Sequence, residues 1–295
     1  MTIRAKGTLF AALILLGCLA QSADAQGILQ RLLGRQRAPC VPALPPTVQI
    51  EANVPSSGKV REPWSTLEGR VVFKGDLPNI ENLQPRVRQH VDMLHLLKGP
   101  KDELHAPTWR IDPKTRGIAN VAVFIKRPKD GMLPIHPDDK NRKDSVVIDM
   151  PFAAFLPHVV AFYPEWYDGK KRAQTGQKLI FKNSSPLARN VRATGHPEHN
   201  PGFNRSLPPG TQYQPSFNPQ LMPVSAQNDV HNWMHAYVWV FDHPYYAITK
   251  ADGTFTIPRV PVGMEVQVVA WHEGVGWVFG GKNGKNVLDF EISAN

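Results

Sequence analysis

The sequence predicts a mainly β protein built from sandwiches, with one short helix, and three observations support this prediction. Short runs rich in Val, Ile and Phe recur along the chain, bounded by Gly, Asn, Asp or Pro. Apolar residues at helical spacing predict one short helix over residues 83–97, despite Pro85. The 28 Pro and 22 Gly supply turns, and a hydrophobic fraction of 42% is enough for a core. The predicted strands cover residues 67–73, 118–125, 146–148, 158–162, 179–181, 237–241, 255–257, 266–271 and 287–292.

Residues 1–25 have the organisation of an export signal. Arg4 and Lys6 precede an apolar run of 13 residues, 8–20, and residues 23–25 (Ala-Asp-Ala) offer the small-x-small pattern that a signal peptidase requires. The run is short for a membrane span, and no later segment is long and apolar enough for one. We therefore expect an exported protein, periplasmic or extracellular, with no transmembrane span.

The two cysteines, Cys18 and Cys40, limit the fold and leave one alternative open. Two thiols exclude a disulfide framework and a four-thiolate zinc site. Residues 15–18 loosely resemble a lipoprotein box, so a lipoprotein acylated at Cys18 is the alternative to cleavage after Ala25. Cleavage leaves Cys40 as the single thiol of the mature chain. It lies in a Pro-rich tether over residues 26–62, whose prolines are expected to interrupt any helix or strand.

The chain is basic, with 34 Lys and Arg against 25 Asp and Glu and a formal net charge of +9 at pH 7. The basic residues are scattered, and runs such as residues 170–172 (Lys-Lys-Arg) are short, so no nucleic-acid-binding motif emerges. An exported basic protein meets anionic envelope polymers first. We expect an envelope protein or an anionic polysaccharide as the partner, and no nucleic acid.

Two distant parts of the chain share the pattern of one small sandwich. Residues 69–73 and 117–124 have the composition of opening strands, and residues 252–257 (Asp-Gly-Thr-Phe-Thr-Ile) with strand 266–271 have that of closing ones. Asp-Gly permits a left-handed turn, after which Phe255 and Ile257 alternate inward. In this ordered set the chain resembles the carboxypeptidase-regulatory-like, or carbohydrate-binding-like, β-sandwiches. The resemblance implies such a domain over residues 63–145 plus 247–295.

The segment between these parts carries a second set of motifs. They are Phe-x-Pro-His at 155–158, Asn-Ser-Ser-Pro at 183–186, Arg-Asn-Val at 189–191, Asp-Val-His-Asn-Trp-Met at 229–234, and Phe-Asp-His-Pro-Tyr-Tyr at 241–246. In these motifs the chain resembles the cupredoxin-like proteins of bacterial envelopes, of the plastocyanin-like or methylamine-utilisation type. The resemblance implies a Greek-key sandwich, with a cupredoxin-like domain over residues 146–246.

The resemblance also implies the positions of a copper site. A blue-copper centre takes two imidazoles, one thiolate and a long axial thioether. His231 and Met234 stand at the loop His and Met positions, whereas Asn228 replaces the thiolate and Arg189 replaces the first His. A fixed cation repels Cu²⁺, and without a thiolate an electron-transfer site is lost. We therefore predict a degenerate copper site with no cofactor, the alternative being copper held by His231, Met234 and a nearby His.

Other candidate positions follow from the same reasoning. The family's further cysteine pair is implied to be lost, with His95 and Ala153 near its places. The turn at 195–199 offers His196 and His199 as another metal chelate. His231 and His235 do not share a metal on an extended strand, where they would lie about 13 Å apart.

No enzyme motif is present: the sequence has no Gly-x-Ser-x-Gly elbow, no Walker or Rossmann glycines and no His-Glu-x-x-His. We expect a protein that is not an enzyme and serves as a binding or assembly module. The alternatives are residual copper or other metal binding at His231 and Met234, and binding of envelope polysaccharide. Exposed aromatic residues expected to bind sugars are Trp166, Tyr167, Trp233 and Trp277.

Overall fold

The computed structural model describes residues 63–127, 132–167 and 169–278, together with the backbone of three further strands at 47–49, 282–284 and 287–292. The predicted signal peptide, both cysteines and most of the predicted tether lie outside the described residues. Within the predicted tether, the structure describes one short strand, β1 (Thr47–Gln49), which pairs antiparallel with β16 (Glu265–His272). This triplet contains no proline and begins with two β-branched residues, which favour an extended backbone.

The first sandwich is built from the two ends of the described chain. Its outer sheet has the order β15-β2-β19-β18, and its inner sheet has the order β1-β16-β3-β14, with β17 also paired to β16. Leu67, Phe255, Val123 and Val268 fill the space between these sheets and are fully or almost fully buried. The further bounds are β2 (Trp64–Phe73), β3 (Ala122–Lys126), β14 (Tyr246–Ile248), β15 (Thr254–Pro261), β17 (Gly276–Val278), β18 (Lys282–Gly284) and β19 (Val287–Ile292).

The second sandwich is continuous in sequence. One sheet has the order β10-β9-β12-β13-β5, the other has the order β11-β8-β4, and β6 forms a hairpin with β7. Ile148, Phe181, Val191 and Val238 lie in the core between its sheets. The bounds are β4 (Ser145–Asp149), β5 (Val159–Phe162), β6 (Glu165–Tyr167), β7 (Arg172–Gln174), β8 (Lys178–Lys182), β9 (Arg189–Thr194), β10 (Phe203–Leu207), β11 (Gln212–Tyr213), β12 (Val224–Gln227) and β13 (His235–Val240).

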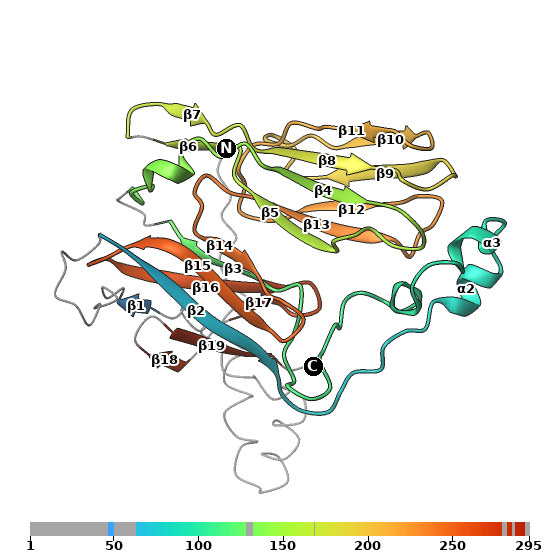
Figure 1. The fold of residues 1–295 in the computed structure, drawn as a ribbon, viewed down its shortest axis with the longest axis horizontal. Helices are drawn as coiled ribbons and strands as arrows, with labels where there is room; N and C mark the ends of the chain where they lie inside the picture. Colours follow the sequence, from blue (N-terminus) through green and yellow to red (C-terminus); the bar gives the residue numbers. More distant parts are fainter. Residues whose placement is uncertain are drawn as a thin grey trace, which may run out of the picture. The chain divides into compact units, whose positions relative to one another are not determined.

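A third apolar cluster joins the two sandwiches, which lie one above the other in Figure 1. It forms because β3, β13 and β16 are buried on both faces, as their nearly continuous apolar sequences favour. In β13, Val238 faces the second core while Trp239 faces the joining cluster, where it meets Phe124 and Trp271. The two sandwiches therefore share a packed interface.

The predicted helix at 83–97 is present but broken in two. The structure has α2 (Gln84–Arg88) and α3 (Met93–Leu96), followed by the 3₁₀ turn η1 (Lys101–Leu104). Leu83, Val87 and Leu96 pack into the core of the second sandwich. In the sequence, however, residues 83–104 are separated from the second sandwich by β3, which is a strand of the first (Figure 1). The break between the helices is where His90 and Asp92 turn toward the second sandwich, as described below.

The prediction of a mainly β fold is confirmed, and every predicted strand coincides with an observed one. The Asp-Gly turn also forms, since Gly253 adopts a φ of +81° and its N–H donates to the Lys250 carbonyl at 2.9 Å. A Cβ on Gly253 would lie 2.2 Å from the Val71 carbonyl oxygen, so the turn requires glycine. The domain boundaries at residues 145/146 and 246/247 stay predictions. No helix within the described residues is long and apolar enough to cross a membrane.

Candidate functional site

The loop at 228–234 is closed by its own hydrogen bonds. The Asn228 side-chain oxygen accepts from the backbone N–H groups of Val230 and His231, at 2.9 and 2.8 Å. The Met234 N–H donates to the His231 carbonyl at 2.8 Å, and the Asn228 N–H donates to the Met234 carbonyl at 3.2 Å. Asn228, at the position where the resemblance implies a thiolate, therefore fixes the loop rather than offering a ligand.

Arg189 enters the interior through the alternation of β9, in which residues 189, 191 and 193 point inward. Its guanidinium contacts His231 Nδ1 at 3.3 Å and donates to the Phe152 carbonyl at 2.6 Å. Because arginine has only donors, His231 Nδ1 must accept, and the ring proton lies on Nε2. This Nε2–H donates to Asp92 at 2.9 Å. We call this chain of three side chains the Arg189–His231–Asp92 relay.

Two of the three side chains of the relay are buried, whereas the Asp92 side chain is 25% exposed. Arg189 and His231 each expose only 1% of their surface. Burial, then the charge of Arg189, lower the pKa of His231 to about 4, although Asp92 opposes the shift. Burial also lowers the pKa of Arg189, while the carboxylates of Asp92 and Glu103 act to raise it. His231 is consequently neutral near pH 7, and Arg189 supplies the positive charge.

The residues at the implied copper positions lie together but do not fit copper. Arg189, Asn228, His231 and Met234 are all at most 2% exposed and are linked by the contacts above. In a histidine ligand a bare ring nitrogen faces the metal, but at His231 a guanidinium faces Nδ1 and a carboxylate faces Nε2. Copper at His231 and Met234 would therefore require Arg189 to leave. Within the described residues, Arg189 Nε and Asn228 Nδ2 are buried without a partner.

Two aromatic groups cover the relay. The His90 ring lies 4.5 Å from the His231 ring, and the Trp233 ring lies 5.5 Å from it. Trp233 is only 7% exposed and its indole N–H donates to the Ala153 carbonyl at 3.1 Å. The expectation that Trp233 is exposed for sugar binding is therefore wrong, because the ring completes the core beside the loop.

The implied positions of the lost cysteine pair also lie near each other. His95 Nε2 hydrogen-bonds to the Pro151 carbonyl at 2.8 Å, and its ring stacks on Phe152 at 5.2 Å, directly before Ala153. Gly99 permits this approach, because a Cβ there would lie 2.7 Å from the Phe152 Cβ. Noncovalent packing thus joins α3 to the loop before β5.

A second buried histidine cluster was not predicted from the sequence. His158 Nε2 lies 2.5 Å from one oxygen of Glu273, and His235 Nε2 lies 3.1 Å from the other. Burial acts to raise the pKa of Glu273, but its bonds to both histidines outweigh burial and hold that pKa well below its ordinary value. Burial acts to lower the pKa of His235, yet its bond to Glu273 and the charge of that carboxylate raise it. The sequence holds one signal: each histidine lies within a residue of the start of an apolar strand, and these two strands, β5 and β13, pair in parallel.

The predicted chelate at His196 and His199 lies on the surface. The two rings stack at 4.8 Å, and Glu198 completes a trio in which every residue is exposed. The Glu198 N–H points to His196 Nδ1 at 3.4 Å, which leaves that nitrogen as an acceptor. A metal site at these residues stays a prediction. His231 and His235 belong to different clusters, His231 with Asp92 and His235 with Glu273.

A groove with a volume of about 480 Å³ opens where the two sandwiches meet. Trp239, which lies in it, is fully buried, and its indole N–H has no partner among the described residues. Trp277 remains 36% exposed. We call this feature the aromatic groove; it is lined by the rings of Phe124, Trp239, Phe241 and Trp277, and by the cations of Lys126, Arg127 and Arg172.

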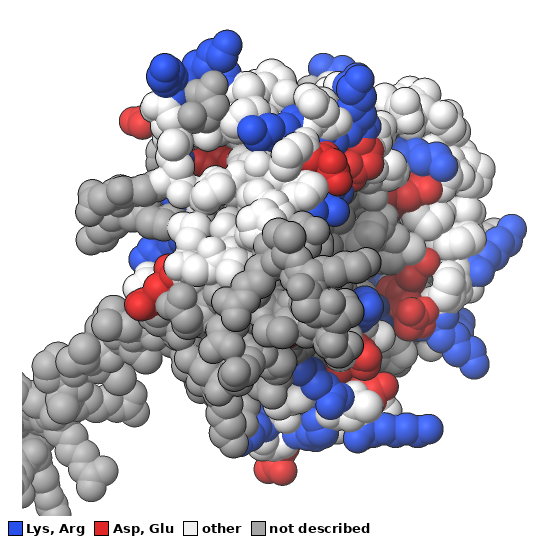
Figure 2. Space-filling view, turned by 60° about the vertical axis from the view of Figure 1, so that its left-hand side comes forward, with Lys and Arg blue, Asp and Glu red and all other residues white. Residues whose placement is uncertain are grey.

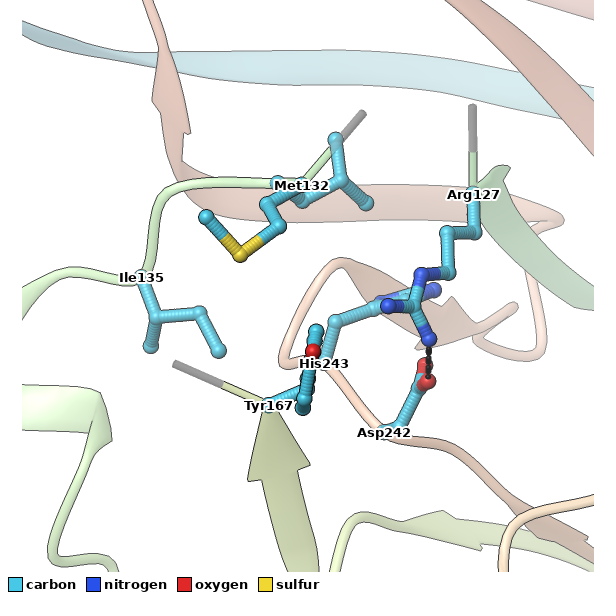
Figure 3. A pocket seen from close by; sticks show the side chains of 7 residues that line it. Arg127, Met132, Ile135, Tyr167, Asp242 and His243 are labelled. Carbon is cyan, nitrogen blue, oxygen red and sulfur yellow. Dashed lines mark hydrogen bonds and ion pairs between the residues drawn. The ribbon is translucent and has the colours of Figure 1, made fainter. Parts of the chain in front are cut away.

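A smaller pocket adjoins the aromatic groove and shares Arg127, Asp242 and His243 with it. Figure 3 shows Met132, Ile135 and Tyr167 around this pocket, with Arg127 paired to Asp242. The Arg127 guanidinium also lies over the Tyr167 ring, 5.5 Å from its centre. Tyr167 is 37% exposed, so it keeps one edge accessible beside the groove.

Charges on the face drawn in Figure 2 are mixed. Lys and Arg lie in several separate groups among Asp and Glu, wherever grey atoms do not cover the surface. The lining of the aromatic groove combines cations with aromatic rings.

Part of the chain is similar to solved cupredoxin structures. The purple cupredoxin from Nitrosopumilus maritimus is 13% identical and matches over 32% of this chain and 97% of its own, with a TM-score of 0.24. Amicyanin from Paracoccus versutus is 15% identical over 40% of this chain and 96% of its own, with a TM-score of 0.26. The copper-containing nitrite reductase from Thermus scotoductus SA-01 is 16% identical over 32% of this chain and 22% of its own, with a TM-score of 0.26. No protein-family model and no curated protein matches the sequence.

Proposed function

We propose that this chain is an exported, non-catalytic binding module that holds an anionic polysaccharide in the aromatic groove. The observation that supports it is the groove itself, whose lining combines four aromatic rings, here called the floor, with three cations, here called the rim. Its volume of about 480 Å³ lies within the range of ligand sites, about 300–1,000 Å³. The module would have kept the sandwich architecture while losing the donor set for copper.

The floor suits the apolar face of a sugar ring. Trp277 offers an exposed face and is backed by Trp239, whose ring lies 5.9 Å away. Large aromatic rings combine a broad apolar surface with a polar edge, and the indole N–H of Trp239 is a donor with no partner among the described residues.

The rim suits negative charge. Arg127 is paired with Asp242 at 2.6 Å, and Arg172 is paired with Glu165. Lys126 is exposed and has no ion-pair partner among the residues that the structure describes. It is therefore the cation of the rim that we expect to pair with a carboxylate of the ligand. The net charge of +9 adds a general attraction for polyanions.

Isothermal titration of the purified chain with polygalacturonate tests this proposal. We expect binding that weakens with salt, no binding to neutral dextran, and a loss of about tenfold or more in Trp277→Ala, since one stacked ring contributes roughly 1.4 kcal/mol. Lys126→Gln should weaken binding and its salt dependence together. Trp166→Ala is the matched control, because Trp166 does not line the groove. Equal affinity of Trp277→Ala and wild type would overturn the proposal.

A further inference from the structure

The three side chains His158, His235 and Glu273 form a compact donor set that the proposed polysaccharide site does not use. One ligand atom from each lies within 4.8 Å of the others. His158 is 5% exposed, and the Glu273 side chain is 6% exposed. His158 and His235 belong to the second sandwich, whereas Glu273 directly follows β16 of the first.

The hydrogen bonds around the two rings fix which nitrogens are available. His158 Nδ1 faces the His235 carbonyl at 2.9 Å, and His235 Nδ1 faces the Trp233 carbonyl at 3.2 Å. A carbonyl only accepts, so both Nδ1 atoms carry a proton. Both Nε2 atoms then face the two oxygens of Glu273, which also accept.

A neutral imidazole has one N–H, yet each of these rings faces an acceptor on both sides. Either two further protons occupy the two contacts between Nε2 and the carboxyl group, or a cation takes the place of those two protons. Two imidazolium charges on one carboxylate leave a net positive charge in a poorly solvated place, which is unfavourable. A divalent metal ion between the two Nε2 atoms and the carboxylate satisfies all three groups at once.

The Nδ1 contacts are those that metal-binding histidines make. A ligand histidine donates its other N–H to a carbonyl or a carboxylate, which fixes the ring. Tyr237 adds an outer contact, because its hydroxyl hydrogen-bonds to Glu273. Zinc bonds of about 2.0–2.2 Å place tetrahedral ligand atoms about 3.4 Å apart, so movements of about 1 Å would seat the ion.

We propose that His158, His235 and Glu273 bind one divalent transition-metal ion, with Zn²⁺ as the best match, and that the ion fastens the two sandwiches together. Two imidazoles and one carboxylate make a zinc donor set with one open position. The His235 side chain is 28% exposed, so that position faces solvent. Because a metal links groups from both sandwiches, binding should stabilise their interface as well as the ligand side chains.

Titration of the chelator-treated full chain with Zn²⁺ tests the site. We expect one Zn²⁺ per chain by calorimetry and by metal analysis, with a rise of several degrees in Tm. Three matched variants separate the candidate clusters: His235→Gln, His90→Gln and His196→Gln. We expect His235→Gln to weaken binding about 100-fold or more, and the other two to leave affinity unchanged.

Two further measurements keep the test decisive if His235→Gln folds poorly. Glu273→Gln keeps the size of the side chain and should also lose the ion. In wild type, bound Zn²⁺ should protect His235, the more exposed of the two histidines, from diethyl pyrocarbonate, as read by mass spectrometry, while His196 stays reactive. The proposal is overturned if wild type binds no Zn²⁺, if His196→Gln or His90→Gln removes binding instead, or if His235 is not protected.

Discussion

The two buried histidine clusters contain similar residues but differ in what faces each ring nitrogen. At His231 a guanidinium faces one nitrogen and a carboxylate faces the other, so a neutral ring is fully satisfied. At His158 and His235 acceptors face all four ring nitrogens, and neutral rings leave two of them without a proton. The first cluster contains the guanidinium cation of Arg189, whereas for the second cluster we propose a bound metal ion.

This difference shows that the neighbours of a histidine decide its chemistry more than its place in a motif does. The resemblance in sequence implies a copper ligand at His231, but Arg189 faces one of its ring nitrogens and Asp92 faces the other. The histidines at 158 and 235 carry no metal motif, yet two backbone carbonyls orient their Nε2 atoms toward one carboxylate. Four changes to these clusters would test whether the two sites differ in this way.

The largest effect is expected from building the donor set that the resemblance implies, with Arg189→His and Asn228→Cys together. The pair would place two imidazoles, a thiolate and a thioether in one cluster with His231 and Met234. We expect stoichiometric Cu²⁺ binding with intense visible absorption from a copper–thiolate bond, measured by titration in a spectrophotometer. Arg189→His alone is the control and should lack that absorption. A folded double variant without copper would show that His231 and Met234 are not in ligand geometry.

Arg189→Met should destabilise the fold by about 3 kcal/mol or more, because it leaves the Phe152 carbonyl and Asp92 without their cation. Urea unfolding measures the loss. Arg192→Met, three residues along the same strand, is the matched control: Arg192 and Asp229 form a pair whose side chains are 45% and 40% exposed. We expect that variant to lose less than about 1 kcal/mol. Equal losses would mean that Arg189 contributes no more than a surface pair.

The stability of wild type relative to His231→Gln should fall between pH 6.5 and pH 4. The pKa of His231 is lowered in the folded state to about 4, from an ordinary value of 6.5. In this interval the unfolded state binds the extra proton, so acid favours unfolding; above it the contribution is fully present. The expected change is on the order of 3 kcal/mol, read as the difference between two urea-unfolding series. A flat difference across this interval would mean that His231 titrates normally.

The smallest effect is expected from Asp92→Asn, which keeps an oxygen to accept from His231 but removes the charge. We expect a loss of about 1 kcal/mol in urea unfolding and no change in Zn²⁺ affinity. Glu273→Gln, the equivalent change in the other cluster, should instead remove Zn²⁺ binding. In a zinc titration, Asp92→Asn would therefore keep its affinity while Glu273→Gln would lose it. Loss of zinc in Asp92→Asn would place the ion at His90, Asp92 and His231.

Apolar strands could be predicted from the sequence, whereas short polar strands could not. The sequence of β13, His-Ala-Tyr-Val-Trp-Val, indicates a strand because it is buried on both faces. In contrast, β10 (Phe-Asn-Arg-Ser-Leu) lies at a sheet edge with its middle residues exposed, so its composition resembles a loop. The packing of α2 and α3 on the second sandwich could not be predicted, because helical periodicity shows an apolar face without its partner.

Each candidate site also has a part that could be predicted from the sequence and a part that could not. The loop of Asn228, His231 and Met234 is local, so its motif is visible in the sequence. The partners that decide its chemistry are distant: Asp92 lies 139 residues from His231, and Arg189 lies 42 residues from it. Glu273 lies 115 residues from His158, and no short motif contains both. The prediction that Trp233 is exposed is wrong because the sequence of the loop does not show that its indole N–H donates to the distant Ala153 carbonyl.

The mainly β class, the apolar strands, the Asp-Gly turn and the absence of a cysteine thiolate among residues 146–246 can all be read from the amino-acid sequence. These follow from local backbone preference, alternation and the presence or absence of an atom type. The tertiary structure alone decided that a guanidinium satisfies His231 and that His158, His235 and Glu273 converge. Hydrogen bonds and charges act over a few ångströms in space, and only the pairing of β5 with β13, and of both sandwiches with each other, brings those groups within reach.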